Sequence, residues 1–291
     1  MKKLICLCLC LLLLAGCAAT YDGPTEAKPM LTEYTVDNYY GFFDGEEVHH
    51  TNRTVYAYDI YGNRVREMEY QDGELYSVTN MKYDDRGNEI SRTAWDRSGW
   101  LPKLSHRTRQ TYDAQGRILT YETLNFWGRV VSGSYYSYDD EARTRTYRNE
   151  SGEILQTTWF DEKGNDIRQT AGEYETVYEY DDRGNCIGWQ SYKDGKPYDR
   201  YEADYDEQDR QVWGRRYDAN GQLTSQTEYV YDEELGTKSY SKNDGGRRVE
   251  TYHADGRLHA VEDYEANGNL TMLQRYYYRD IRVPVEGGST P

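Results

Sequence analysis

The stretch Tyr180-Asp181-Asp182-Arg183-Gly184-Asn185 decides how this chain folds, because it recurs along the sequence. Tyr83-Asp84-Asp85-Arg86-Gly87-Asn88 repeats it letter for letter. An aspartate that begins a turn accepts hydrogen bonds from backbone N–H groups a few residues on, and glycine adopts positive φ without a steric cost. The motif therefore predicts a type I turn closed by a glycine bulge, a common connection in β-hairpins.

Related copies of this motif lie along most of the chain. Each begins at an aromatic residue, and the fuller copies carry glycine four positions later. Strands that recur about every 12 residues between turn signals are typical of all-β folds. Fuller copies begin at Tyr58, Tyr112, Phe160, Tyr217, Tyr252 and Tyr264, shorter ones at Tyr70 and Tyr192, and degenerate ones at Trp95, Tyr138, Tyr205 and Tyr231.

Between the turns, aromatic and acidic residues alternate. In Tyr174–Tyr180 one parity is tyrosine or threonine and the other is mostly acidic, which places the 32 tyrosines mainly on one face of a sheet. The chain is otherwise poor in Leu, Ile, Val and Phe. We expect an all-β protein: an elongated antiparallel β-meander of about 18 short strands in a single repeat sheet. Strand twist argues against a flat ribbon and leaves a coil, a trough or a partial shell open.

The units resemble YD repeats, also called RHS repeats. The clearest example is Tyr217–Thr227, and the resemblance covers about residues 55–280. It implies strips of a spiralling β-sheet, which in large toxins and teneurins encloses a hollow shell. This chain looks too short to close such a shell, and no toxin-like domain follows the repeats. Shorter units such as Tyr70–Gly73 are more weakly similar to MORN-type repeats found in some antitoxins.

The N-terminus carries targeting signals. Lys2 and Lys3 precede the uncharged run Leu4–Leu14, and Leu14-Ala15-Gly16-Cys17 follows. A positive end, a short apolar core and small residues at a cleavage point predict a signal peptide over residues 1–16. The segment resembles the lipobox of bacterial lipoproteins, which implies that the Cys17 thiol is lipidated. The alternative is an ordinary secretory signal with an incidental cysteine.

This interpretation divides the chain and locates the protein. We expect the lipidated Cys17 and a tether over residues 17–30, then a repeat domain over residues 31–291. That domain would have an atypical cap at 31–54 and a short tail at 281–291. The protein would sit in the cell envelope, lipid-anchored on the extracytoplasmic side of a bacterial membrane.

Charge and cysteine content restrict the partners. The full chain has a net charge of −16, and loss of Lys2 and Lys3 with the signal makes it −18. This argues against nucleic acid, anionic headgroups and sulfated glycans, and favours a soluble monomer. After Cys6, Cys8 and Cys10 leave and Cys17 is modified, Cys186 has no disulfide partner. Its role is either a small strand residue or a reactive thiol.

The sequence contains no motif for catalysis. The five histidines do not have zinc-ligand spacing, and there is no nucleophile elbow, phosphate loop or dinucleotide fingerprint. Carboxylates are abundant, but no pair is singled out for glycoside hydrolysis. We therefore expect a non-enzyme with no cofactor and no metal.

The candidate ligand-binding residues are Trp100 and Trp127, which lie where the repeat period slips. Long loops on a rigid scaffold often carry binding residues. Trp95 and Trp159, in contrast, stand at or beside the tyrosine position of the motif. The first hypothesis is a non-catalytic binding or adhesion scaffold for a neutral glycan or a basic protein. The alternatives are an envelope immunity or antitoxin-like protein and a passive structural spacer.

Overall fold

The structure, a computed structural model, describes residues 25–43, 46–242 and 244–284, with only the backbone of residues 39–43, 46–49 and 284. This part of the chain forms one sheet of 20 strands. No helix among these residues has the length and hydropathy needed to cross a bilayer. The predicted signal peptide over residues 1–16 and the lipidation of Cys17 lie outside the described residues.

Short turns join the strands, and the strand bounds are as follows. They are β1 (Thr25–Phe43), β2 (Glu46–Tyr58), β3 (Arg64–Gln71), β4 (Glu74–Tyr83), β5 (Glu89–Asp96), β6 (Lys103–Tyr112), β7 (Ile118–Leu124), β8 (Val130–Asp139), β9 (Thr144–Arg148), β10 (Ile154–Phe160), β11 (Asp166–Ala171), β12 (Tyr174–Tyr180), β13 (Cys186–Lys193), β14 (Lys196–Tyr205), β15 (Gln211–Asp218), β16 (Leu223–Asp232), β17 (Thr237–Ser241), β18 (Arg247–Tyr252), β19 (Leu258–Tyr264) and β20 (Leu270–Pro284).

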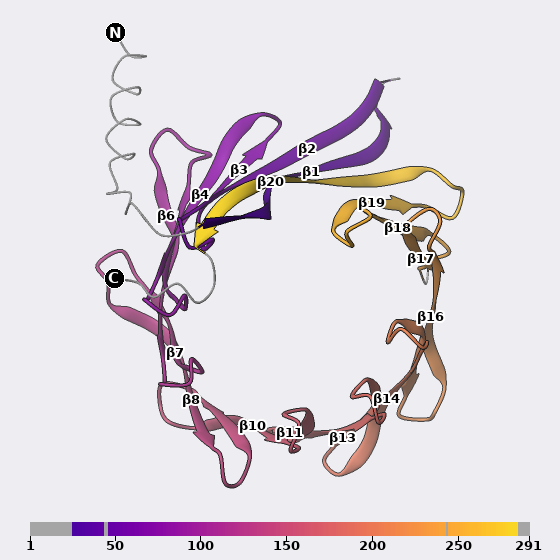
Figure 1. Cartoon of the computed structure of the whole chain (residues 1–291). Helices are drawn as coiled ribbons and strands as arrows, with labels where there is room; N and C mark the ends of the chain where they lie inside the picture. The colour runs from indigo at the N-terminus through magenta and orange to yellow at the C-terminus, as the bar shows by residue number, and fades with distance from the viewer. Residues whose placement is uncertain (1–24, 44–45, 243, 285–291) are drawn as a thin grey trace.

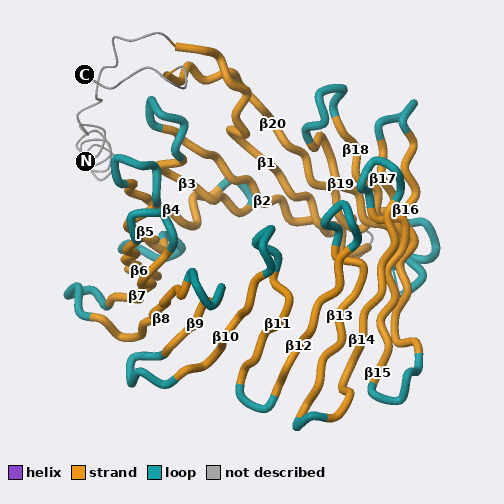
Figure 2. Tube along the Cα trace, turned by 60° about the horizontal axis from the view of Figure 1, so that its bottom comes forward, coloured by secondary structure: helices purple, strands orange, loops and turns teal. Residues whose placement is uncertain are grey.

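The sheet closes on itself (Figures 1 and 2). Each strand pairs antiparallel with the next, and β1 also pairs antiparallel with β20, from Thr25 opposite Pro284 to Asn38 opposite Met272. The all-β antiparallel prediction is confirmed. The expectation of an open coiled or curled meander of about 18 strands is wrong, because pairing of the first and last strands converts the sheet into a 20-strand barrel. From its sequence the chain looks too short to close a shell built from a spiralling sheet. A single circuit of the sheet is enough to close a ring.

Strands occupy parts of the ranges expected at the two ends of the domain. β1 begins at Thr25, inside the range 17–30 expected to be a tether, and β20 continues to Pro284, inside the expected tail 281–291. The range 31–54, expected to be a cap, lies largely in β1 and β2. These segments lack the turn motif, and their backbone groups pair with each other across the seam of the barrel.

The repeated motif forms the turn that its sequence predicts. One carboxylate oxygen of Asp84 accepts hydrogen bonds from the backbone N–H of Arg86 at 3.0 Å and of Asn88 at 2.8 Å. The Gly87 N–H donates to the Asp84 carbonyl at 3.0 Å, and Gly87 has a φ of 81°. The strand register shifts between Lys82 and Tyr83, as a glycine bulge requires.

The tyrosine that precedes the turn has a second role. The Tyr83 hydroxyl donates to the Arg64 carbonyl at 2.8 Å, and the Tyr180 hydroxyl donates to the Asp166 carbonyl at 2.9 Å. In each case the acceptor lies at the start of the preceding strand. The hydrogen bond therefore joins the two strands of a hairpin at the end opposite their connecting turn. The same contact is made by Tyr112, Tyr138, Tyr205, Tyr231 and Tyr278. Tyr58 donates instead to the Leu31 carbonyl, well inside β1.

Most tyrosine rings share one face of the sheet, as the alternation predicts. The register places Tyr178, Trp189 and Tyr201 in one row across β12, β13 and β14. At the seam, Tyr34 of β1 stacks on Tyr56 of β2 at 6.2 Å and on Tyr276 of β20 at 5.9 Å. Stacked aromatic pairs add about 0.5–1.5 kcal/mol each beyond the area they bury. The ring is therefore closed by aromatic contacts as well as by backbone pairing.

The sheet has a thin core. The buried apolar side chains among the described residues are Val78, Met81, Leu124, Ala203, Val261 and Val283. Both faces of most strands are partly accessible to solvent, as in β3 and β5. Twenty strands spaced about 4.8 Å apart form a ring about 30 Å across before tilt widens it. Barrels of about 16–18 strands already leave a water-filled channel. A 20-strand ring whose two faces are both partly accessible to solvent is therefore hollow.

Tyr34→Ala should weaken the seam more than a comparable substitution elsewhere. It removes two stacked pairs, whereas Tyr147→Ala removes the single pair with Tyr136 at 5.4 Å. We expect Tyr34→Ala to lower the free energy of unfolding by about 1–3 kcal/mol more than Tyr147→Ala does. Urea midpoints of the two variants measure the difference, and equal midpoints would contradict a special role of the seam.

The tyrosines should also make the fold sensitive to alkali. Burial raises the pKa of Tyr180 to about 12 and raises the pKa of Tyr83 and Tyr138. A raised folded-state pKa stabilises the fold below the unfolded value near pH 10, and this stabilisation is lost as pH rises through the folded value. We expect unfolding and tyrosinate absorbance to rise together between about pH 10 and 12. Ionisation of these tyrosines near pH 10 with the circular dichroism of the sheet unchanged would refute this.

Candidate binding site at one rim of the barrel

The barrel has two rims of different chemistry. Because neighbouring strands are antiparallel, all odd-numbered strands begin at one rim and end at the other, and even-numbered strands run in the opposite direction. We call the rim where odd-numbered strands begin the first rim. We name the first the ladder rim: it holds the turns that follow even-numbered strands, from Asp59 in the first to His253 in the last. We name the second the tip rim: it holds the turns that follow odd-numbered strands. Both β1 and β20 have their outer ends, Thr25 and Pro284, at the ladder rim.

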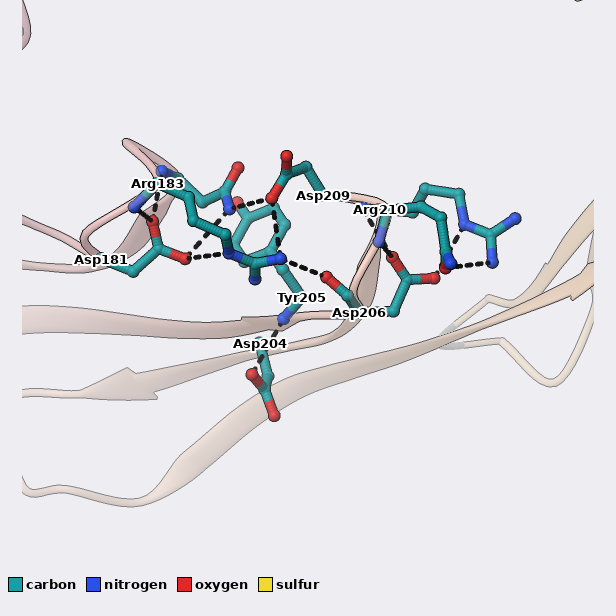
Figure 3. A network of polar contacts seen from close by, with 9 residues as sticks. Asp181, Arg183, Asp204, Tyr205, Asp206, Asp209 and Arg210 are labelled. Carbon is teal, nitrogen blue, oxygen red and sulfur yellow. Dashed lines mark hydrogen bonds and ion pairs between the residues drawn. The ribbon is translucent and has the colours of Figure 1, made fainter.

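Side chains connect neighbouring turns along the ladder rim (Figure 3). The Arg183 guanidinium donates to the carbonyl of Asp206 in the next such turn at 2.8 Å and lies 2.9 Å from the Asp209 carboxylate. Arg210 in turn pairs with Asp206 at 2.8 Å and with Glu233 of the following turn. In some of these turns an arginine follows the glycine, or follows Asp209, which stands in place of the glycine. This arginine lies over the tyrosine near the end of the second strand after the turn. Arg210 lies 4.3 Å from the Tyr231 ring centre.

The carboxylates of the ladder rim hold the turns in shape. The side-chain amide of Asn185 donates to Asp181 and holds the pKa of that carboxyl below its usual value, and Asn88 does the same for Asp84. Such groups stay ionised as hydrogen-bond acceptors, in contrast to the raised pKa of a general acid. No group of three or more His, Cys, Asp or Glu among the described residues is arranged to hold a metal ion.

Cys186 lies at the start of β13, partly buried. Its carbonyl accepts the hydroxyl of Tyr205 at 3.0 Å. Burial raises the pKa of the Cys186 thiol, which is the opposite of the activation found in reactive thiols. The position favours the role of a small strand residue.

Trp100 and Trp127 lie at neighbouring tips of the tip rim. Trp100 stands in the connection between β5 and β6 and is 94% exposed, and Trp127 stands between β7 and β8 and is 81% exposed. Pairing of β6 with β7 makes the two hairpins adjacent. The two tryptophans come from loops where the sequence predicted binding residues. They project into solvent and are absent from the linings of the shallow surface grooves found among the described residues.

The turn at Trp127 shows why it is exposed. Asn125 replaces the usual aspartate and accepts hydrogen bonds from the N–H of Trp127 and of Arg129 at 3.0 Å each. Phe126 and Trp127 thereby occupy the two central turn positions, which point away from both strands. Their rings meet edge to face at 5.2 Å. Other copies of the turn carry residues such as Asp85 and Arg86 at these positions.

The remaining tryptophans belong to the sheet. Trp189 stacks on Tyr201 at 5.8 Å, Arg168 covers Trp159 at 4.7 Å and Arg215 covers Trp213 at 4.6 Å. Trp95 lies within β5, opposite Val78 and Leu104. The interpretation of Trp95 and Trp159 as substitutes in the aromatic pattern agrees with these positions.

Sequence reasoning missed the apolar neighbours of the two tryptophans. Leu101 and Phe126 are each 60% exposed, and Val131 is 57% exposed. The available signal was the pair Phe126-Trp127 at the central turn positions, where most other copies carry at least one polar residue, as in Asp85-Arg86 and Ala114-Gln115. We name the set Trp100, Leu101, Phe126, Trp127, Val130 and Val131 the tip cluster.

Comparisons with known proteins report similarity of shape only. No protein-family model and no curated protein matches the chain. A porin-like protein from Bacteroides uniformis is 12% identical with a TM-score of 0.37, covering 86% of this chain and 96% of its own. A porin-like protein from Bacteroides vulgatus is 15% identical with a TM-score of 0.33, covering 60% of this chain and 94% of its own. A TcdB2–TccC3–Cdc42 structure is 12% identical with a TM-score of 0.23, covering 81% of this chain and 19% of its own. None of these similarities is close enough to assign a function.

Replacing the exposed tryptophans should leave the fold intact. Trp100→Ala and Trp127→Ala remove side chains with little buried area, so we expect changes within about 0.5 kcal/mol in the free energy of unfolding. Trp189→Ala removes a stacked ring and should cost at least about 1 kcal/mol. Urea denaturation of the three variants tests this, and a cost at Trp100 or Trp127 equal to that at Trp189 would show a structural role.

Proposed function

We propose that this protein is a non-catalytic binding protein of the bacterial cell envelope. The hollow barrel is the scaffold, and the tip cluster is its contact surface. The observation that carries the proposal is the 94% and 81% exposure of Trp100 and Trp127 on adjacent hairpins, while the other four tryptophans lie in the sheet. Large exposed aromatic side chains grouped on one side of a protein mark interaction sites.

Charges on both faces of the sheet support a scaffold that stands outside the bilayer. Arg248 and Asp263 pair at 2.6 Å on the tyrosine face, and Arg109 and Glu122 pair at 2.6 Å on the other face. A barrel that spans a membrane presents a continuous apolar band to lipid. The described residues place such charged pairs on both faces of this sheet.

The positions of the chain ends support display of the tip cluster away from the anchor. β1 begins at Thr25 on the ladder rim, opposite the tip cluster. If Cys17 is lipidated, residues 17–24 reach at most about 28 Å when extended, comparable to the height of the short strands. The anchor would therefore hold the ladder rim toward its own membrane and leave the tips outward.

The alternatives receive less support. A passive spacer would have a uniformly polar surface, and the tip cluster departs from it. The resemblance to YD and MORN-type repeats stays a prediction, and the immunity or antitoxin-like role that it suggests has no separate support among the described residues. A basic protein partner fits poorly, because Arg97, Lys103 and Arg129 flank the tip cluster.

Binding to isolated cell envelopes tests the proposal. Purified protein comprising residues 18–291 is sedimented with washed envelopes, and the apparent affinity is compared with that of the Trp100→Ala/Trp127→Ala variant. Leu235→Ala is the matched control, because Leu235 is 69% exposed but lies on the ladder rim. We expect the double variant to bind at least about tenfold more weakly and the control to bind normally. Wild-type protein that fails to sediment, or equal binding by the double variant, would refute the proposal.

A further inference from the structure

We propose that the tip cluster docks on a lipid bilayer that carries anionic headgroups, with its aromatic side chains entering the interface between headgroups and acyl chains. This inference rests on the proposed function and names the partner. Three features support it: the convex shape of the site, its apolar composition and a local reversal of charge.

The site is convex. Trp100 and Trp127 stand at the ends of hairpins, and a groove that includes Gly128 of the same turn is lined by strand residues such as Arg107 and Leu124 and not by either tryptophan. A glycan or a peptide is usually held in a concave site whose polar groups fix its orientation. Fluid lipid needs no preformed pocket, because it rearranges around an inserted side chain. Tryptophan and other large apolar residues are typical of surfaces that enter the membrane interface.

The charge around the tips is positive although the chain is acidic. Residues 96–107 and 124–131 contain the cations Arg97, Lys103, Arg107 and Arg129 and one acid, Asp96. The whole chain has a net charge of −16. Lys103 lies opposite Asp96 in the register of β5 and β6 but is not within ion-pair distance of it. The other three cations make no ion pair with another described residue, whereas Arg109 beside them pairs with Glu122. The Arg107 guanidinium reaches the turn at Gly128 of the neighbouring tip, beside Phe126 and Trp127 in the chain.

This arrangement changes the conclusion drawn from net charge. The total of −16 argues against anionic lipid only if all charges act together. Salt screens exposed charges beyond about 10 Å, so a surface at the tips interacts mainly with the local cations. Basic residues near a membrane surface are attracted to anionic lipid. Acids such as Glu74 and Glu150 occupy the neighbouring parts of the tip rim and confine docking to the sector from β5 to β8.

Vesicle flotation tests the inference. The protein comprising residues 18–291 is mixed with vesicles of phosphatidylcholine alone or with about 30% phosphatidylglycerol. The variants are Trp100→Ala/Trp127→Ala and the charge variant R97Q/K103Q/R107Q/R129Q, with Leu235→Ala as control. We expect wild type and the control to bind the anionic vesicles at least about tenfold more tightly than the neutral ones. The tryptophan variant should lose binding to both, and the charge variant should lose only the preference. Circular dichroism and urea midpoints verify that every variant is folded.

The outcomes separate this inference from the function on which it rests. Tryptophan-dependent binding to envelopes without binding to either vesicle would overturn the lipid partner and leave the binding function standing. Equal binding to neutral and anionic vesicles would overturn the role of the cations. Absence of binding to both envelopes and vesicles would overturn both proposals.

Discussion

Pairing of β1 with both of its neighbours is the constraint on which the rest of the structure depends. β1 joins β2 on one side and β20 on the other, and Tyr34 stacks on a tyrosine of each. A sheet of 20 strands with two free edges would expose unpaired backbone groups along β1 and β20. Closure removes those edges and fixes the curvature that gives the barrel its two rims.

A sheet with so little aliphatic core is stabilised by many small contacts. Most turns of the ladder rim repeat the same set: an aspartate-centred turn, a tyrosine hydroxyl bonded to the preceding strand and, in several of them, an arginine over an aromatic ring. Individual contacts of these kinds are worth about 0.5–1.5 kcal/mol. Their repetition around a closed ring replaces the thick core that the composition cannot supply.

The two rims have different roles: side chains of the ladder rim stabilise the turns, and the tip cluster on the tip rim is exposed to solvent. On the ladder rim, polar side chains such as Arg183 and Asp209 bind one another and the turns, which leaves few groups for a partner. On the tip rim between β5 and β8, the cations Arg97, Arg107 and Arg129 make no ion pair with another described residue, and Trp100 and Trp127 are largely exposed. This asymmetry follows from strand direction, because each residue of the repeat returns to the same rim at every second strand.

The sequence by itself determined the features that depend on local contacts. Asp84, Gly87 and Asn88 form their turn with neighbours in the chain, and strand alternation puts Tyr178 and Tyr180 on one face. It also indicated Trp100 and Trp127, since both stand where the period slips. Only the tertiary structure decided closure, because Thr25 and Pro284 meet across the whole chain and no local pattern encodes that pairing. It also brought the Arg107 guanidinium of one tip to the turn at Gly128 of the next, a side-chain contact between hairpins that no local pattern gives.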